Sequence, residues 1–117
     1  MEGLKDLDDF SHIILLYHFH QAEDMQLLVS PFLDTELHGI FATRAPVRPN
    51  PIGISIVELN EIDENILKIK GVDMLDTTPL LDIKPFVPHF DHRKAHAGWL
   101  AKTSHEKVET FYSDSRF

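Results

Sequence analysis

The sequence predicts a mainly β fold in one small domain, either a barrel or a sandwich. Several short runs are rich in β-branched and aromatic residues, turn-forming residues separate them, and no long helical period is present. A chain of 117 residues is large enough to bury a core of its own. No repeat or linker divides it, so we expect a single domain over residues 1–117.

The first predicted strands flank a proline-rich loop. Residues 10–20 form a nearly continuous apolar run, which is typical of a strand buried on both faces. Residues 38–43 precede the loop and residues 52–59 follow it. The second of these runs alternates after Gly53, as a half-buried strand does.

The second half of the chain contains two further extended segments. Residues 66–70 alternate and follow an acidic turn at 60–65, so residues 52–70 are predicted to form a hairpin. Residues 80–88 are extended, and their prolines indicate a sheet edge or a strand end. Residues 95–107 have weak helical character, which predicts a short helical segment.

The composition excludes several kinds of protein. The chain has no cysteine, which rules out disulfides, thiolate metal sites and cysteine nucleophiles. Its net charge of -8 argues against a broadly basic nucleic-acid-binding surface. No apolar run approaches a membrane span and the N-terminus lacks a secretion signal, so we expect a cytoplasmic protein with no membrane partner.

The loop at residues 42–55 carries the strongest signal for a binding site. It contains Arg44, Arg48 and Asn50 among three prolines, which fix their own φ and restrict the residues before them. Residues 41–57 contain no acidic side chain, so a local cationic site is possible on an acidic protein. These features predict a loop that binds an anionic or planar ligand, and the alternative is a hairpin whose arginines are merely solvated.

Two other polar groups lie between or on the predicted strands. Residues 73–79 offer a carboxylate, two hydroxyls and backbone amides before a proline, although most such segments are simply Asp-capped turns. Asp82 and Lys84 lie on one face of the following strand. They are either functional groups or a weak surface ion pair, which is the commoner case.

The eight histidines raise the question of a metal site. Those with suggestive spacing are His18, His20, His89, His92 and His96. A catalytic zinc uses three such ligands, but the sequence has no His-Glu-x-x-His pattern, so we expect no metal. His20 ends its strand and precedes Gln21, which places it better to meet an organic ligand.

Three segments in order carry a resemblance to a known family. Residues 10–20, 39–55 and 75–88 together resemble the TrmO family, also called YaeB-like or TsaA-like. The resemblance extends over nearly the whole chain, including residues 113–117. It implies a small antiparallel β-barrel with short helical segments, usually a homodimer, that binds S-adenosylmethionine. The implied reaction methylates N6 of threonylcarbamoyladenosine, next to the anticodon of certain tRNAs.

The chain departs from the family pattern at two places. It starts at Met1 without the N-terminal strand region in which members carry a Pro-Arg-Gln cofactor segment. The family's Asp-Gly-Thr-Pro reads Asp-Thr-Thr-Pro at residues 76–79. A threonine in place of glycine disfavours positive φ and narrows the space for a close ligand.

The resemblance and the residue types together suggest how the cofactor is held. Arg44, or alternatively Arg48, would anchor polar parts of the cofactor by charge-assisted hydrogen bonds. Backbone groups near Ile54 and residues 76–79 would read the adenine, and His20 would border the ribose or the amino-acid end. The expected cofactor-binding residues are His20, Gln21, Arg44, Ile54, Asp76, Thr77, Thr78 and Pro79.

The catalytic roles are assigned from residue type. Asp76 or Asp82 would remove the proton from the acceptor nitrogen. Asn50 would orient the acceptor, and Lys84 would meet the threonyl carboxylate of the substrate. The expected catalytic residues are Asn50, Asp76 and Lys84, and the expected substrate-binding residues are Arg48 and Asp82.

Two other functions remain open beside tRNA methylation. One is a shortened, non-catalytic family member that binds S-adenosylmethionine or a nucleoside, and the other is a metal-dependent hydrolase that uses the histidines. The acidic net charge fits a tRNA partner only if a dimer gathers its basic residues into one stripe. Besides the two arginine loops, that stripe would contain Arg93, Lys94 and Lys102.

Overall fold

The computed structural model describes residues 2–22, 24–30, 36–72 and 76–102. Backbone contacts divide the chain into two compact units. The first unit contains Met1–His18 and Gly53–Arg93, and the second contains Phe19–Ile52 and Lys94–Phe117. We describe each unit by itself, and one domain over the whole chain stays a prediction.

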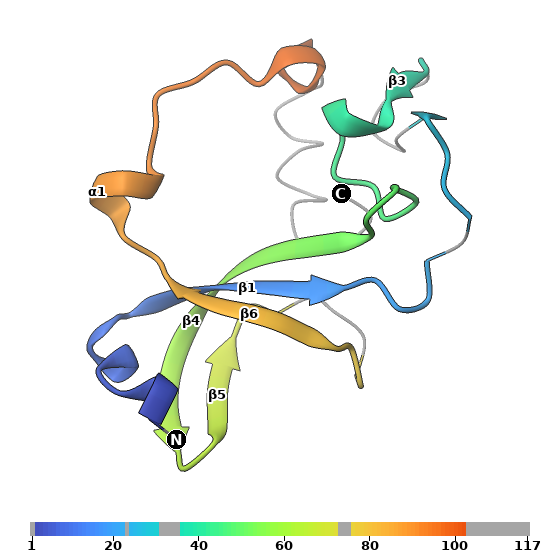
Figure 1. Ribbon diagram of the computed structural model, residues 1–117. Coiled ribbons are helices and arrows are strands. Elements are labelled where there is room, and N and C mark those ends of the chain that lie inside the picture. The colour runs from blue at the N-terminus through green and yellow to red at the C-terminus, as the bar shows by residue number, and fades with distance from the viewer. Residues whose placement is uncertain (1, 23, 31–35, 73–75, 103–117) are drawn as a thin grey trace. The chain divides into compact units, whose positions relative to one another are not determined.

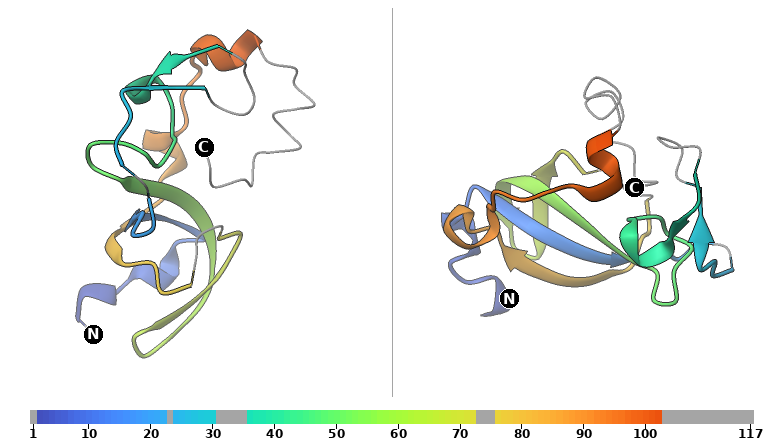
Figure 2. Two further views of the ribbon diagram at one scale, coloured as in Figure 1. Left: turned by 90° about the vertical axis from the view of Figure 1, so that its right-hand side faces the viewer. Right: turned by 90° about the horizontal axis from the view of Figure 1, so that it is seen from above.

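The first unit is built on a four-stranded antiparallel sheet. Its strands are β1 (His12–His18), β4 (Ile52–Asp63), β5 (Ile66–Lys70) and β6 (Leu80–Pro85), in the spatial order β5-β4-β1-β6. Strand β1 lies between β4 and β6, as Figures 1 and 2 show. Two short 3-10 turns, Glu2–Leu4 and Leu7–Asp9, precede it. The expected mainly β, antiparallel architecture is confirmed.

One face of β1 forms the core of this unit. Ile13, Leu15 and Tyr17 are buried, together with Val57 of β4. The Tyr17 hydroxyl lies 2.8 Å from Ser55 Oγ, so the polar tip of the ring is satisfied beside the apolar core. The predicted burial of residues 10–20 on both faces is wrong, because alternate residues of β1 are only half-buried. A continuous apolar run therefore does not by itself indicate how well the second face is covered.

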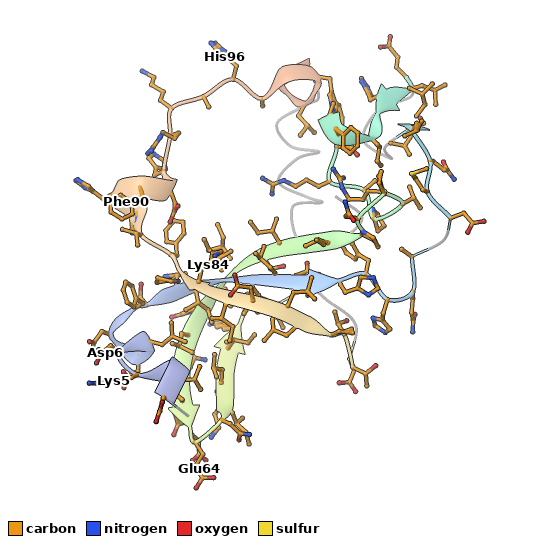
Figure 3. The ribbon with its side chains drawn as sticks, in the orientation of Figure 1. Lys5, Asp6, Glu64, Lys84, Phe90 and His96 are labelled. Atoms are coloured by element: carbon orange, nitrogen blue, oxygen red, sulfur yellow. The ribbon has the colours of Figure 1, made fainter. Side chains whose placement is uncertain are left out.

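The hairpin of β4 and β5 confirms one prediction and corrects another. Strand β5 has the predicted bounds, but β4 continues to Asp63, so the turn occupies 64–65 rather than 60–65. Leu59 pairs with Ile69 and Glu61 pairs with Lys68, which leaves Asn60 as a bulge. Glu64, at the tip in Figure 3, has a φ of 57°. The bulge lets the acidic segment remain in the strand.

Strand β6 is an edge strand, as its prolines predicted. Pro85 is its last residue and pairs with Ile13 of β1. The extended segment ends there rather than at residue 88, because a short helix, α1 (Pro88–Asp91), begins with a proline in its first turn. Asp91 accepts a hydrogen bond from the backbone N–H of Val87 at 2.8 Å. No pattern in the sequence predicted this helix.

The expectation of a closed barrel is wrong for the residues that the structure describes. The sheet order is linear, and its two edge strands, β5 and β6, are not paired with each other. Side chains of both edge strands instead line an apolar cavity of about 330 Å³. The lining residues are Leu4, Leu15, Asn65, Leu67, Ile69, Leu80 and Ile83.

The second unit is built from short elements around a tight turn. Strands β2 (Leu28–Val29) and β3 (His38–Gly39) pair antiparallel, and the 3-10 turn Ile40–Ala42 follows β3. The predicted strand over 38–43 is therefore wrong beyond Gly39. Thr43 closes the turn because its hydroxyl and its backbone N–H both donate to the Ile40 carbonyl, at 2.8 and 3.1 Å.

The predicted helical segment over 95–107 lies partly outside the described residues. Its described part contains a 3-10 turn, Gly98–Lys102. Within the described part of the chain, no helix is long and apolar enough to cross a membrane.

The turn before β6 holds a residue in an unfavourable backbone conformation. Thr77 has a φ of 66°, in the left-handed region that a β-branched side chain rarely adopts. Its backbone N–H donates to Asp76 Oδ1 at 3.0 Å. This is the position at which the family pattern has glycine. The turn keeps the glycine-type conformation although a threonine occupies it.

The buried face of β1 generates a stability prediction. Replacing Ile13, which is 0% exposed, with alanine should lower the free energy of unfolding by about 3 kcal/mol, because it leaves a cavity in the core. The matched control is Ile56→Ala on β4, where the side chain is 52% exposed and the loss should stay below about 1 kcal/mol. Urea unfolding measures both values. Equal losses would contradict the assigned core.

The left-handed Thr77 generates a second prediction. Thr77→Gly should raise the free energy of unfolding by about 1 kcal/mol, because glycine adopts this φ without the steric cost. Thr78→Gly is the control and should lower it by a similar amount, since Thr78 has no positive φ to relieve. Thermal unfolding of both variants checks the opposite signs. A loss of stability in Thr77→Gly would refute the strain.

Candidate functional site

The arginine loop of the second unit begins at a buried polar residue. Thr43 is 8% exposed and is the polar residue of the buried set among the described residues. Its Oγ1 accepts a hydrogen bond from the Ala45 N–H at 3.2 Å while donating to the turn before it. The hydroxyl therefore uses both its donor and its acceptor capacity within the backbone. The first residues of the loop are fixed to the 3-10 turn.

Arg48 closes the same loop on itself. Its Nη1 donates to the Thr43 carbonyl at 2.8 Å and to the Ala45 carbonyl at 3.1 Å. The side chain is half-buried. A hydrogen bond from a charged donor is worth more than a neutral one, so this contact stabilises the loop conformation. Arg48 thus has a structural task, and its predicted contact with substrate stays a prediction.

Arg44 lies in a different environment within the loop. It is exposed, and among the described residues it makes no hydrogen bond or ion pair. Residues 41–57 contain no acidic side chain that could neutralise it locally. Within the described part of the chain, Arg44 is therefore an unpaired cation on a loop that prolines and Arg48 restrain. Such a group can bind a carboxylate or phosphate without first losing a partner.

The turn after β1 brings a histidine next to the end of this loop. The Phe19 N–H donates to the Pro51 carbonyl at 2.7 Å, and the Ala22 N–H donates to the Phe19 carbonyl at 3.0 Å. Within that turn, His20 Nε2 is buried and has no hydrogen-bond partner in the described part of the chain. A buried nitrogen without a partner costs about 1–3 kcal/mol. Gln21, beside it, is exposed.

The expected site residues divide between the two units. In the second unit lie His20, Gln21, Arg44, Arg48 and Asn50, and in the first unit lie Ile54, Asp76, Thr77, Thr78, Pro79, Asp82 and Lys84. The strand end of β1 holds the 76–79 turn, because the His18 N–H donates to the Pro79 carbonyl at 2.9 Å. Most of the first-unit group is exposed, including Ile54, Asp76 and Asp82.

Asp82 and Lys84 form an ion pair on β6. Lys84 Nζ lies 3.0 Å from Asp82 Oδ2, with side chains 58% and 47% exposed. Figure 3 shows Lys84 on this strand. Asp82 Oδ1 also accepts the backbone N–H of Ile83 at 2.8 Å. The hydrogen bond from Lys84, with that backbone contact, holds the pKa of Asp82 below its usual value. These contacts therefore favour the charged form of the aspartate.

The histidines do not form a metal site in the described residues. No group of three or more potential ligands is close enough there to hold a metal ion. The hydrolase interpretation thus receives no support from the structure.

Trp99, which contacts the turn before the arginine loop, was not predicted from the sequence as a site residue. Trp99 Nε1 donates to the Ala42 carbonyl at 2.7 Å, and its ring stacks on His38. Trp99 is the single tryptophan of the chain, which could have drawn attention to it. The partner residues could not have been found from spacing, because 57 positions separate Ala42 from Trp99.

Comparisons with known proteins point to one family. A family model described as the tRNA-methyltransferase O N-terminal domain matches residues 1–92. A probable S-adenosyl-L-methionine-binding protein of Pyrococcus abyssi is 61% identical over 117 residues, which are 99% of this chain and 63% of that protein. A tRNA (adenine(37)-N6)-methyltransferase of Mus musculus is 37% identical over 92 residues, or 76% of this chain and 21% of that protein.

A solved structure supports the same relationship. The crystal structure of TrmO from Pseudomonas aeruginosa matches with a TM-score of 0.69 and 35% identity, over 95% of this chain and 54% of that one. The chain spans less than two thirds of the length of each of these three relatives. Because the family model matches residues 1–92 of the 117, the chain belongs to the tRNA-methyltransferase O family.

Proposed function

We propose that this protein binds S-adenosylmethionine and methylates N6 of threonylcarbamoyladenosine next to the anticodon of tRNA. The observation that carries the proposal is Arg44, an exposed cation without a partner in the described residues, on a loop that Arg48 closes. A relative from Pyrococcus abyssi is named as a probable S-adenosyl-L-methionine-binding protein, and one from mouse as a tRNA (adenine(37)-N6)-methyltransferase. Both names agree with the chemistry that such a loop offers.

The residues of the second unit fit this cofactor. Its amino-acid end carries a carboxylate, which the Arg44 guanidinium can bind through paired hydrogen bonds. Its ribose carries hydroxyls, and a ribose hydroxyl or a polar atom of the amino-acid end would give the buried His20 Nε2 the partner that it lacks in the described chain. Gln21 would add a contact from the same turn. In the first unit, Ile54 and residues 76–79 would offer backbone groups to the adenine.

The protein's own contribution to catalysis is positioning and proton removal. When bound, S-adenosylmethionine supplies an electrophilic methyl group on its sulfonium. The acceptor nitrogen is urea-like and weakly nucleophilic, so a base that takes its proton raises its reactivity. The lowered pKa of Asp82 makes its carboxylate a weaker base, which favours Asp76 for this role. Asn50 would orient the acceptor group by hydrogen bonding.

Substrate binding would use charged groups on both units. Lys84 would bind the threonyl carboxylate of the modified base. It would either break its ion pair with Asp82 to do so or contact both carboxylates at once. Arg48 would contribute through guanidinium nitrogens other than Nη1, which the loop backbone already uses. Each of these residues would then combine a contact inside the chain with one to the substrate.

A homodimer would help an acidic chain to bind tRNA. With a net charge of -8, a single chain as a whole repels a polyanion. Two copies would bring together two arginine loops and the basic residues Arg93, Lys94 and Lys102 in one stripe. Exposed Ile54 and Ile56 offer apolar surface that such an assembly could cover. We place this activity in the cytoplasm, where tRNA is available.

A non-catalytic S-adenosylmethionine- or nucleoside-binding protein is the second candidate. It is favoured by the left-handed Thr77, which puts a side chain where the family pattern has none. It predicts cofactor binding without methyl transfer.

The Arg44 assignment generates the central prediction. Arg44→Ala should weaken binding of S-adenosylmethionine about tenfold, because one charge-assisted hydrogen-bonded contact is lost. Lys5→Ala is the control: it removes the same charge from an exposed side chain in the first unit and should leave affinity unchanged. Calorimetric titration measures both. Equal affinities would remove Arg44 from the cofactor site.

A methylation assay separates the two candidate functions. Purified protein is incubated with labelled cofactor and with tRNA that carries the threonylcarbamoyl group, and unmodified tRNA serves as the control. Label transferred only to the modified tRNA supports the methyltransferase. Cofactor binding without transfer supports the second candidate, and absence of both refutes the proposed function.

The Asp82–Lys84 pair generates a pH prediction. Because the folded pKa of Asp82 lies below the usual 3.8, the pair stabilises the fold above that pH and loses its effect as pH falls through the folded pKa. A carboxyl NMR titration should find the Asp82 midpoint below 3.8, and Lys84→Met should raise it. Lys68→Met, which removes the partner of Glu61, should leave that midpoint unchanged. No shift in Lys84→Met would contradict the pair.

A further inference from the structure

A tryptophan from the C-terminal part of the chain is bound to the turn that precedes the arginine loop. Trp99 Nε1 donates to the Ala42 carbonyl at 2.7 Å. Both residues belong to the second unit, and the turn Gly98–Lys102 lies beside the turn that follows β3 (Figure 1). Ala42 ends the 3-10 turn and comes two residues before Arg44. The indole therefore holds the backbone just before the proposed cofactor ligand.

The same indole also holds the start of that turn. Its ring stacks on His38, with centroids 4.5 Å apart and planes 18° from parallel. His38 belongs to β3, and Ala42 is the last residue of the following turn, so the contacts bracket the segment between them. An aromatic stack and a hydrogen bond from one rigid side chain fix position and orientation together.

The loop beyond this point depends on the turn for its own shape. Thr43 directly follows Ala42, is buried, and closes the turn through the Ile40 carbonyl. Its own carbonyl accepts Arg48 Nη1, which closes the loop. If the turn moves, both contacts move with it. Arg44 lies inside this closed segment, so these contacts restrain the backbone from which its side chain extends.

We propose that Trp99 is a positioning residue that pre-organises the 43–48 loop so that Arg44 is held ready for the cofactor, an inference that rests on the proposed function. Holding a binding loop in its bound conformation improves affinity because less freedom is lost on binding. Without the indole, the Ala42 carbonyl loses its donor and the His38 ring loses its stack. The loop then samples other conformations, and Arg44 binds the cofactor from only a fraction of them.

Two substitutions at Trp99 separate its contacts. Trp99→Phe keeps an aromatic ring for His38 but removes the N–H donor, and it should weaken S-adenosylmethionine binding about threefold. Trp99→Ala removes both contacts and should weaken it about tenfold or more. The control is Lys5→Ala, which should bind as the unaltered chain does. Calorimetry is run at a temperature at which every variant is folded.

Substitutions at two glycines test the two contacts of Trp99 without changing the indole itself. Gly98 has a φ of 60°, and an added Cβ would meet no atom within 4 Å, so Gly98→Ala acts through backbone strain alone. Gly39 also has open space around its Cβ position but an ordinary φ of -60°. Gly98→Ala should displace Trp99 and weaken cofactor binding, whereas Gly39→Ala should not.

Amide hydrogen exchange reads loop positioning in the absence of any cofactor. The Ala45 N–H donates to Thr43 Oγ1, and the Arg48 N–H donates to the Pro46 carbonyl at 2.8 Å, so both report on loop closure. Trp99→Ala should speed exchange at both amides about tenfold while leaving core amides of β1 unchanged. A purely global loss of stability would speed all of them alike.

The outcomes distinguish this inference from the proposed function. Weaker cofactor binding together with faster exchange confined to the loop supports Trp99 as a positioning residue. Unchanged exchange in Trp99→Ala, or unchanged affinity beside a cofactor-binding unaltered chain, overturns it. If the unaltered chain does not bind the cofactor, the proposed function is overturned. The inferred effect of Trp99 on cofactor binding is then overturned too, even if hydrogen exchange shows that Trp99 orders the loop.

Discussion

Backbone pairing of β1 on both of its edges is the constraint on which the rest of the structure depends. Strand β1 lies between β4 and β6, and its buried face, Ile13, Leu15 and Tyr17, supplies half of the buried apolar residues of the described chain. His18, the last residue of β1, and Phe19, the residue after it, each donate one backbone hydrogen bond within their own unit. The His18 N–H reaches the Pro79 carbonyl in the first unit, and the Phe19 N–H reaches the Pro51 carbonyl in the second. A change that loosened β1 would therefore release the 76–79 turn of the first unit.

The two arginines of the loop illustrate how neighbours rather than residue type decide a role. Arg44 and Arg48 are four positions apart in one acid-free stretch. Arg48 spends Nη1 on two backbone carbonyls, and Arg44 has no partner among the described residues. The contacts of Arg48 close a loop that its prolines by themselves would only stiffen. Arg44, which makes no such contact among the described residues, remains available as a cation. Under the proposed function, Arg44 would bind the ligand while Arg48 supports the loop, so two identical side chains would have different roles.

Sequence patterns predicted best what is local and regular. The alternation of apolar and polar residues predicted the bounds of β5, and the prolines predicted that β6 is an edge strand. Both signals depend on only a few neighbouring residues. Residues 38–43 were wrongly predicted as a strand because threonine is common in strands. Here the Thr43 hydroxyl instead closes a 3-10 turn. The prediction of a closed barrel was wrong because pairing between β5 and β6 depends on residues far apart in the sequence, which alternation does not encode. For the site, residue type identified Arg44 and His20 as candidates. That Arg44 and His20 Nε2 have no partner among the described residues became visible only in three dimensions. Trp99 escaped notice since its contact spans 57 positions.

The 76–79 turn separates what a residue prefers from what its surroundings require. A threonine in place of glycine was expected to disfavour positive φ, yet Thr77 has a φ of 66°. A left-handed conformation costs an L-residue about 1–2 kcal/mol, so other contacts must outweigh that cost. The Pro79 carbonyl is held by β1, Leu80 pairs with Tyr17, and the Thr77 N–H binds the Asp76 carboxylate. The sheet fixes the end of the turn, and the contact between Thr77 and Asp76 restrains the residues before it, so the threonine adopts the left-handed conformation. The backbone geometry of this turn is therefore a property of the sheet, and a ligand that reads backbone groups there would meet the same path whether glycine or threonine occupies the position.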